Sequence, residues 1–281
     1  MVFRTLVSTD ELAAHLDDAQ WVVCDCRHDL ADPGAGRNAY TEAHIPGARF
    51  LHLDTDLSGI RTGRNGRHPL PLPGELAARL GALGIGRGKQ VAAYDAQGGM
   101  YAARLWWLLR WLGHEAVAVL DGGLLKWIAE GHPMTAAVPQ PEAQEFERRP
   151  GVVPVDATFV LIHLDGPGMR LIDARAPDRF AGRNETLDPI AGHIPGTLNR
   201  FFKLNLDERG CFKPPLVLKD EFVALLGDAS PREVVHQCGS GVTACHNLLA
   251  MEHAGLGGSH LYPGSWSEWC ADRERPIASG D

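Results

Sequence analysis

The stretch that decides the fold is Leu171-Ile172-Asp173-Ala174-Arg175, followed by Gly192-His193-Ile194-Pro195-Gly196. Close counterparts stand in the first half of the chain, Val23-Cys24-Asp25-Cys26-Arg27 and Ala43-His44-Ile45-Pro46-Gly47. Two more pairs of segments follow in the same order, 94–102 with 236–244 and 122–127 with 264–269. Matching segments in the same order, roughly 145 residues apart, indicate one duplicated domain rather than a solenoid of short repeats.

Within each half, short apolar runs rich in β-branched residues alternate with helical patterns. The runs that we interpret as buried strands are 21–24, 91–94, 117–120, 171–172, 234–236 and 261–262. The helical patterns between them include 74–83, 100–112 and 219–226. This alternation predicts an α/β fold of two tandem domains, each a parallel β-sheet covered by helices on both faces.

The segment between the halves is rich in proline. It contains Pro133, Pro139, Pro141, Pro150 and Pro154. Proline disrupts both long helices and central strands, so this segment is predicted to be a linker. We therefore expect an N-terminal domain over 1–133, a linker over 134–155 and a C-terminal domain over 156–281.

Composition excludes several classes of protein. The 281-residue chain has 44% hydrophobic residues, enough to bury sizeable cores, and a net charge of −8 that argues against a nucleic-acid-binding protein. No apolar run of about 18 residues predicts a membrane helix, and the start reaches Asp10 and Glu11 without the apolar core of a signal peptide. Six cysteines without regular spacing suit a reducing compartment, so we expect a cytoplasmic protein that does not bind a membrane.

The segment Cys238-Gly239-Ser240-Gly241 stands between a predicted strand that ends at His236 and a predicted helix over 242–253. Two glycines let the backbone curl with its amides turned inward, as an anion-binding nest requires. The N-terminus of the following helix adds a partial positive charge. Such sites lower the pKa of a cysteine from about 8.5 into the range ~3.5–7.5, so we predict a reactive thiolate at Cys238 rather than an inert buried thiol.

The sequence gives little support to two other roles for the cysteines, in a phosphatase and in a zinc site. A cysteine phosphatase needs an arginine six residues after its nucleophile, where this chain has Ala244. A zinc site needs paired cysteines or histidines, but Cys24 and Cys26 share one face of a strand and no second pair follows, so no metal is expected. The matching loop of the first half has Ala96 in place of Cys238, and we predict that the first domain is catalytically inactive.

Taken together, these residues resemble the tandem-domain rhodanese and 3-mercaptopyruvate sulfurtransferase family. The resemblance covers nearly the whole chain, including both His-Ile-Pro-Gly segments and Cys238-Gly239-Ser240-Gly241-Val242-Thr243-Ala244. In this family, Gly-Ser after the cysteine is typical of members that use mercaptopyruvate, and Arg-Lys of members that prefer thiosulfate. The resemblance implies a rhodanese-like sulfurtransferase that carries sulfur as a persulfide on Cys238 and releases pyruvate. It also implies that thioredoxin, a small thiol or cyanide accepts the sulfur and that no cofactor is needed.

The resemblance also assigns arginines that bind the substrate. Arg179 matches the arginine that holds the substrate carboxylate. Arg175 follows Asp173 by two residues and is interpreted as its structural ion-pair partner. At the place of the family's second substrate arginine this chain has Thr186, which leaves Arg183 or Arg200 as the substitute.

Further site residues are implied in both halves. Asp54 and His68 match positions that form a relay with the loop serine, here Ser240, and a histidine oriented by a carboxylate can move a proton as pyruvate leaves. Other residues expected to contact the substrate are Gly239, Gly241, Val242 and Thr243 in the loop and Tyr101 in the first half.

Two alternatives stay open. One is a thiosulfate sulfurtransferase, although the uncharged Gly239 and Ser240 favour a donor with one carboxylate over thiosulfate, a compact dianion. The other is a non-enzymatic module that uses the same persulfide as a sulfur carrier or as a sensor. Steady-state turnover with a small acceptor separates an enzyme from such a module.

Overall fold

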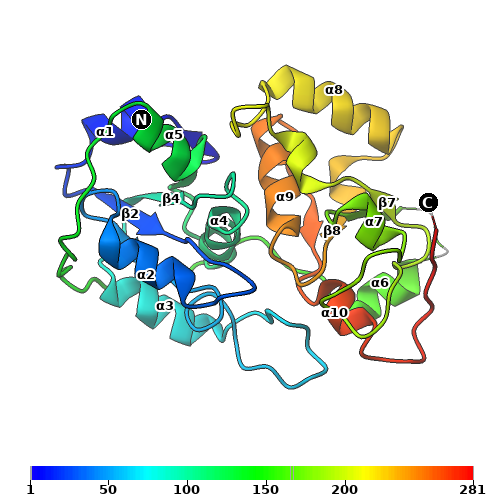
Figure 1. The fold of residues 1–281 in the computed structure, drawn as a ribbon. Coiled ribbons are helices and arrows are strands. Elements are labelled where there is room, and N and C mark those ends of the chain that lie inside the picture. The colour runs from blue at the N-terminus through cyan, green and yellow to red at the C-terminus, as the bar shows by residue number, and fades with distance from the viewer. Residues whose placement is uncertain (1, 165, 167, 281) are drawn as a thin grey trace. The chain divides into compact units, whose positions relative to one another are not determined.

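The computed structural model describes residues 2–164, 166 and 168–280, which form two compact units (Figure 1). The first unit contains residues up to 59, 71–152 and 207–212, and the second contains 60–70, 153–206 and the residues from 213 onward. The loop 60–70 therefore belongs to the second unit although it stands in the first half of the sequence. In the described chain, no helix or strand lies between Ala129 and Ala157, where the sequence predicts the linker. The domain boundaries at residues 133 and 156 remain a prediction.

Five parallel strands form the sheet of the first unit, in the order β1-β5-β4-β2-β3. On one face, sheet side chains pack with Leu12, Tyr40 and Trp127 of three helices, α1, α2 and α5. A further helix, α4, contacts β4 and β5. The elements are β1 (Leu6–Val7), α1 (Thr9–Ala14), β2 (Trp21–Asp25), α2 (Ala35–Glu42), β3 (Arg49–Phe50), α3 (Pro73–Ala82), β4 (Gln90–Tyr94), α4 (Ala102–Trp111), β5 (Val117–Leu120) and α5 (Gly123–Ala129).

Four parallel strands form the sheet of the second unit, in the order β7-β6-β8-β9. One face packs against α6 and α10, whose Val160, Trp266 and Trp269 are fully buried. The helix α9 contacts β8 and β9. The elements are α6 (Ala157–His163), β6 (Arg170–Asp173), α7 (Pro177–Phe180), β7 (Leu198–Asn199), η1 (Phe202–Asn205), α8 (Pro215–Leu226), η2 (Pro231–Glu233), β8 (Val234–Gln237), α9 (Ala244–His253), β9 (His260–Leu261) and α10 (Ser265–Trp269).

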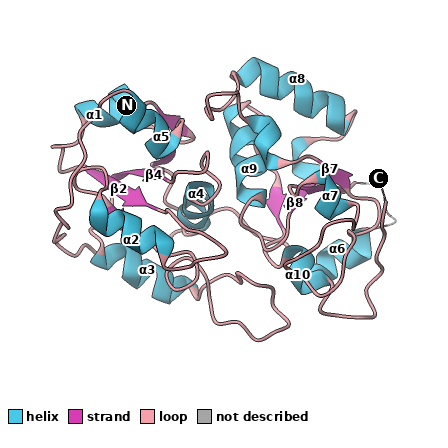
Figure 2. Cartoon of the chain, in the orientation of Figure 1, coloured by secondary structure: helices cyan, strands magenta, loops and turns pink. Residues whose placement is uncertain are grey.

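The predicted α/β class and the two parallel sheets are confirmed. Each of the six apolar runs singled out in the sequence lies in or overlaps a strand, as Figure 2 lets the reader follow. The edge strands β1, β3 and β7 were not predicted. Each is two residues long, and two residues carry no measurable period.

A buried ion pair explains the repeated Asp-x-Arg. The Asp25 carboxylate accepts hydrogen bonds from the backbone amide of Arg27 at 2.9 Å and from its guanidinium at 2.7–3.1 Å. Arg27 Nη2 also donates to the carbonyl of Ala43 at 2.7 Å. In the second unit, Arg175 makes the same contacts with Asp173, which confirms the predicted structural pair.

The repeated His-Ile-Pro-Gly is structural as well. The backbone of His44 forms an antiparallel bridge with Thr135, and that of His193 forms one with Ala278, in each case near the end of its own half. Each imidazole turns back on its own unit, where Nδ1 lies 2.6 Å from the carbonyl oxygen of Tyr40 or 2.9 Å from that of Phe180. The two segments therefore make equivalent structural contacts in the two units.

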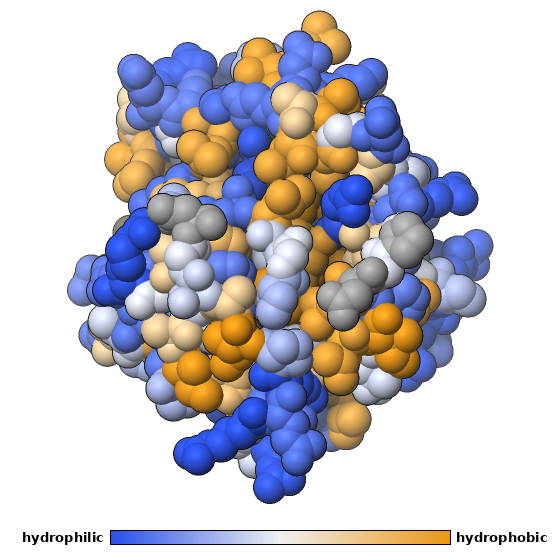
Figure 3. Space-filling model, turned by 90° about the vertical axis from the view of Figure 1, so that its right-hand side faces the viewer, coloured by the Kyte–Doolittle hydropathy of each residue, from blue (hydrophilic) through white to orange (hydrophobic). Residues whose placement is uncertain are grey.

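The exposed surface carries apolar side chains in several places. On the face drawn in Figure 3, groups of apolar side chains (orange) lie among hydrophilic ones (blue). Apolar atoms ordinarily contribute much of a folded protein's surface. None of the helices in the described ranges combines the length and the apolar character that crossing a membrane requires.

We predict that Arg27→Met destabilises the first sheet by about 3 kcal/mol, because it leaves the Asp25 carboxylate buried without its cation. Hydrogen exchange of the β2 and β4 amides measures the free energy of opening of this sheet. The control Arg87→Met removes an exposed arginine of the same unit and should change protection by less than about 0.5 kcal/mol. Equal protection in both variants would contradict a stabilising role for the pair.

Candidate active site

Strand register identifies the residue of the first unit that corresponds to Cys238. Asp173 of β6 stands opposite Gln237 of β8, and Cys238 follows. Asp25 of β2, which makes the same ion pair as Asp173, stands opposite Tyr94 of β4, so the residue in the place of Cys238 is Asp95. The predicted match with Ala96 is wrong by one residue, because the first loop is one residue longer before its helix begins.

In the first unit this loop encloses a carboxylate of the chain itself. Asp95 is fully buried, and burial raises its pKa while hydrogen bonds from backbone amides oppose the rise. The amides that donate to its two oxygens, at 2.8–3.0 Å, are those of Gln97, Gly99, Tyr101 and Ala102. Convergent amides of this kind form an anion-binding nest. The geometry that the sequence predicts for the cysteine loop is thus present in the first unit, with an aspartate in it.

In the second unit the corresponding loop begins with a thiol. Cys238 is 2% exposed. The amides of Gly239, Ser240, Val242 and Thr243 have no hydrogen-bond acceptor among the described residues. Gly241 has φ +76°, and a methyl group at this position would lie 2.2 Å from the carbonyl oxygen of Pro263, so only glycine fits. The loop therefore leaves amides available to an anion at the N-terminus of α9.

Ser265 holds the thiol's backbone in place. Its Oγ accepts a hydrogen bond from the amide of Cys238 at 3.1 Å and donates one to the carbonyl of Tyr262 at 3.0 Å. Ser265 has φ +54° and is the only non-glycine residue of the described chain with a positive φ. The first residue of α5, Gly123, has φ +58° at the corresponding place. A serine here costs roughly 1–3 kcal/mol of backbone strain, which points to a functional use of its hydroxyl.

The loop 60–70 brings a histidine to the cysteine loop. Gly66 has φ +82° and approaches Gly264 closely, and the amide of Arg67 donates to Ser267 Oγ at 3.0 Å. The next residue, His68, is buried, and its Nδ1 lies 2.7 Å from Ser240 Oγ. The structure thus brings together the histidine and the serine of the predicted relay.

Three arginines and three carboxylates lie beside the loop. Arg175 pairs with Asp173 and with Glu185 at 3.4 Å. Burial lowers the pKa of Arg175, but the two carboxylates and the Cys238 thiolate raise it by more. The pKa of Arg175 is therefore above its ordinary value. Arg179 forms a two-pronged pair with Glu185 at 2.8 Å.

Arg67 pairs with the third carboxylate, Asp188. Burial raises the pKa of Asp188 above its ordinary value, although Arg67 opposes the rise. Arg67 was missed in the sequence. Its only signal there was its place directly before His68, in a loop already singled out.

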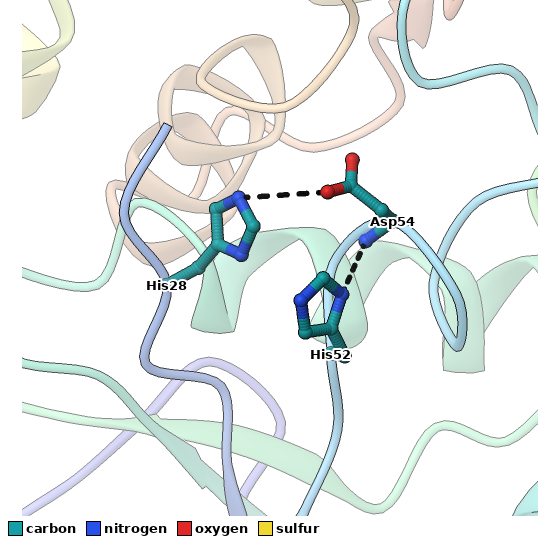
Figure 4. Close-up of side chains that lie close together, drawn as sticks. All are labelled: His28, His52 and Asp54. Carbon is teal, nitrogen blue, oxygen red and sulfur yellow. Dashed lines mark hydrogen bonds and ion pairs between the residues drawn. The ribbon is translucent and has the colours of Figure 1, made fainter. Parts of the chain in front are cut away.

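A second group of polar side chains lies in the first unit. The potential ligand atoms of His28, His52 and Asp54 are all within 4.8 Å of one another (Figure 4). His52, however, accepts a hydrogen bond from the Asp54 amide at Nδ1 and lies 2.8 Å from the Pro33 carbonyl oxygen at Nε2. Because both nitrogens of His52 are engaged, only His28 and Asp54 remain as candidate metal ligands. Metal sites usually take at least three ligands from the protein.

The comparisons with known proteins agree with this architecture. A model of the rhodanese-like domain matches residues 8–130 and again residues 157–272. The chain belongs to the rhodanese family.

Relatives match over almost its whole length. A protein of Pseudomonas aeruginosa named probable 3-mercaptopyruvate sulfurtransferase is 47% identical over 279 residues, which cover 98% of each chain. The thiosulfate sulfurtransferase of Bos taurus is 33% identical and covers 96% of this chain and 93% of its own. The solved structure of 3-mercaptopyruvate sulfurtransferase from Leishmania major is 30% identical, with a TM-score of 0.84 over 95% of this chain and 74% of that one.

Within the second rhodanese unit the structure groups some predicted site residues and separates others. Arg179 lies beside Gly239, whereas Arg183 is exposed and its amide donates to the carbonyl of Asp178. Arg200 is buried and paired with Asn205 and Glu221, which leaves it in a structural role.

Two predicted site residues lie in the first rhodanese unit. Tyr101 packs edge-on against His28, with ring centroids 5.3 Å apart. Asp54 Oδ2 lies 4.0 Å from His28 Nε2. Their parts in the reaction stay predictions.

Ser265→Gly should slow the alkylation of Cys238 and should be more stable than Ser265→Ala. Both variants lose the two hydrogen bonds of the hydroxyl, but only glycine removes the strain, so we expect the free energy of unfolding of Ser265→Gly to exceed that of Ser265→Ala by about 1 kcal/mol. Losing the hydroxyl frees the Cys238 amide, and alkylation of Cys238 by iodoacetamide should slow roughly fivefold, as expected for a lost hydrogen bond of ~1 kcal/mol. The control Ser265→Ala keeps the strain and should lose both stability and rate. An unchanged alkylation rate in both variants would contradict a positioning role for Ser265.

Proposed function

We propose that this chain is a sulfurtransferase that takes sulfur from 3-mercaptopyruvate onto Cys238 and passes it to a thiol or to cyanide. The observation that carries the proposal is a buried thiol at an open nest of amides, where the other unit holds a carboxylate in the same kind of nest. A nest that accepts a carboxylate suits a thiolate or a persulfide anion equally well. Relatives that match nearly the whole chain carry the names of such enzymes.

The proposed first step conserves atoms and electrons. The Cys238 thiolate attacks the sulfur of the donor, an S–S bond forms, and the donor's C–S bond breaks with its electron pair left on carbon. That carbon takes up one proton, so the thiol proton of the donor is in effect transferred to the methyl group of pyruvate. His68 with Ser240, 2.7 Å apart, is the pair proposed to move this proton.

In the second step a nucleophile removes the outer sulfur and restores the thiolate. The proposed acceptors are thioredoxin, a small thiol or cyanide, and the proposed place of action is the cytoplasm. The first unit takes no part in covalent chemistry, since Asp95 stands where the thiol would be. Both steps are complete with the chain's own residues, so no cofactor is proposed.

Thiosulfate is the second candidate donor, and one observation bears on it. Gly239 and Ser240 bring no charge, but the guanidiniums of Arg67 and Arg179 lie next to Gly239, so the loop has cations after all. Their pairing with Asp188 and Glu185 balances those charges. A site with little net charge favours a monoanion such as mercaptopyruvate over a compact dianion.

Cys238→Ser should abolish sulfur transfer without unfolding the chain, because serine keeps the packing and lacks the nucleophilic sulfur. Mass spectrometry of the wild type after treatment with mercaptopyruvate should show one added sulfur on Cys238. In the Cys238→Ser background, Asp95→Cys places a thiol in the first nest and should not gain a persulfide at a comparable rate. Sulfur found on Cys245 or Cys270 of the wild type would refute the assignment.

Mercaptopyruvate should exceed thiosulfate in kcat/KM by at least about tenfold, equivalent to ~1.4 kcal/mol of transition-state preference. Replacing Gly239-Ser240 by Arg-Lys should narrow this gap, since it adds positive charge that suits a dianion. Steady-state kinetics with both donors and cyanide as acceptor measure the ratio. Equal use of both donors by the wild type would move the protein to the thiosulfate branch.

A further inference from the structure

We propose that Arg67 binds the carboxylate of the sulfur donor together with Arg179, so that the loop 60–70 supplies half of the anion site. This inference rests on the proposed function and names the residue that gives it donor specificity. It concerns the second unit alone, to which both arginines and Cys238 belong.

The position of the two guanidiniums is the first observation. A methyl group built on Gly239 would lie 2.8 Å from Arg67 Nη2, and 3.5 and 3.6 Å from the two terminal nitrogens of Arg179. Gly239 is the residue directly after Cys238. Both cations therefore border the space that a side chain at 239 would fill, directly beside the residue that carries the thiol.

The unused nitrogens are the second observation. Arg67 Nη1 pairs with Asp188, and no acceptor for Nη2 exists among the described residues. Arg179 uses Nε and Nη2 for Glu185, which leaves Nη1 without an acceptor in the same part of the chain. One free terminal nitrogen of each arginine thus borders Gly239, a pattern that suits the two oxygens of one carboxylate.

Asp188 is the positioning residue for this pair. Its Oδ1 accepts from Arg67, and its Oδ2 lies 3.6 Å from Arg179 Nη2. Its side chain is 2% exposed, so solvent screens these contacts little. Two guanidiniums at one glycine repel each other, and a shared carboxylate offsets that repulsion while keeping both in place before a donor arrives.

The backbone of the loop fixes Arg67 from the other side. Gly66, with φ +82°, allows the close approach to Gly264, and the Arg67 amide is held by Ser267 Oγ at 3.0 Å. The amide of Ser267 in turn donates to the carbonyl of Gly239 at 2.9 Å. Arg67 and the residue that it borders are therefore tied to the same turn of α10, which favours a preformed site.

The test compares two alkylating agents that differ in one carboxylate. Cys238 displaces bromide from 3-bromopyruvate, an α-keto acid, and from bromoacetone, its neutral ketone counterpart. The ratio of the two alkylation rates reports on carboxylate binding without requiring turnover. Arg67→Ala should lower this ratio at least about tenfold and leave the bromoacetone rate nearly unchanged, while Arg67→Lys should retain part of it. The control Arg64→Ala removes an exposed arginine of the same loop and should keep the wild-type ratio.

A second variant reaches the same contact from the other partner. Gly239→Ala adds the methyl group that meets Arg67, so it should lower the ratio, and combining it with Arg67→Ala should add little further loss. An unchanged ratio in Arg67→Ala would overturn the proposal even if mercaptopyruvate still forms the Cys238 persulfide. Failure of mercaptopyruvate to form any persulfide in the wild type would instead overturn the proposed function, and the alkylation ratio would still decide the role of Arg67.

Discussion

A buried carboxylate at the carboxyl end of one central strand organises each unit. Asp25 and Asp173 are fully buried, and such a charge is tolerated only with a cation and hydrogen bonds around it. The arginine two residues later provides both, and it also binds the carbonyl before the His-Ile-Pro-Gly segment. Loops that leave the carboxyl edge of a parallel sheet are where ligands bind in such folds. The ion pair of each unit therefore ties the carboxyl edge of the sheet, where the nest begins, to the histidine segment.

In the second unit the same pair extends into the site. Arg175 contacts Glu185 as well as Asp173, and Glu185 holds Arg179. A chain of ion pairs thus links Arg179, which borders the cysteine loop, to Asp173 in the sheet. Side chains that are already paired in this way lose little conformational entropy when a ligand binds.

Much of this could be predicted from residues close in sequence. The repeated motifs predicted the duplication, the apolar runs located the long strands, and the glycines around Cys238 predicted its nest. Two features resisted prediction for physical reasons. A single extra residue in the first loop leaves the glycine pattern intact, so only hydrogen-bond register shows that Asp95 replaces the cysteine. The pair of Arg67 with Asp188 joins positions 121 residues apart, and no local pattern encodes such a contact.

The carboxylate of Asp95 has one more consequence. Its nest is occupied by a ligand attached to the same chain, and tethering gives a ligand an effective concentration far above that of any solute. The first unit therefore resembles a binding site with a permanent competitive inhibitor, and free anions in the cell do not compete for its amides. A duplicated domain can in this way keep the fold of a binding site while no longer binding anions from solution.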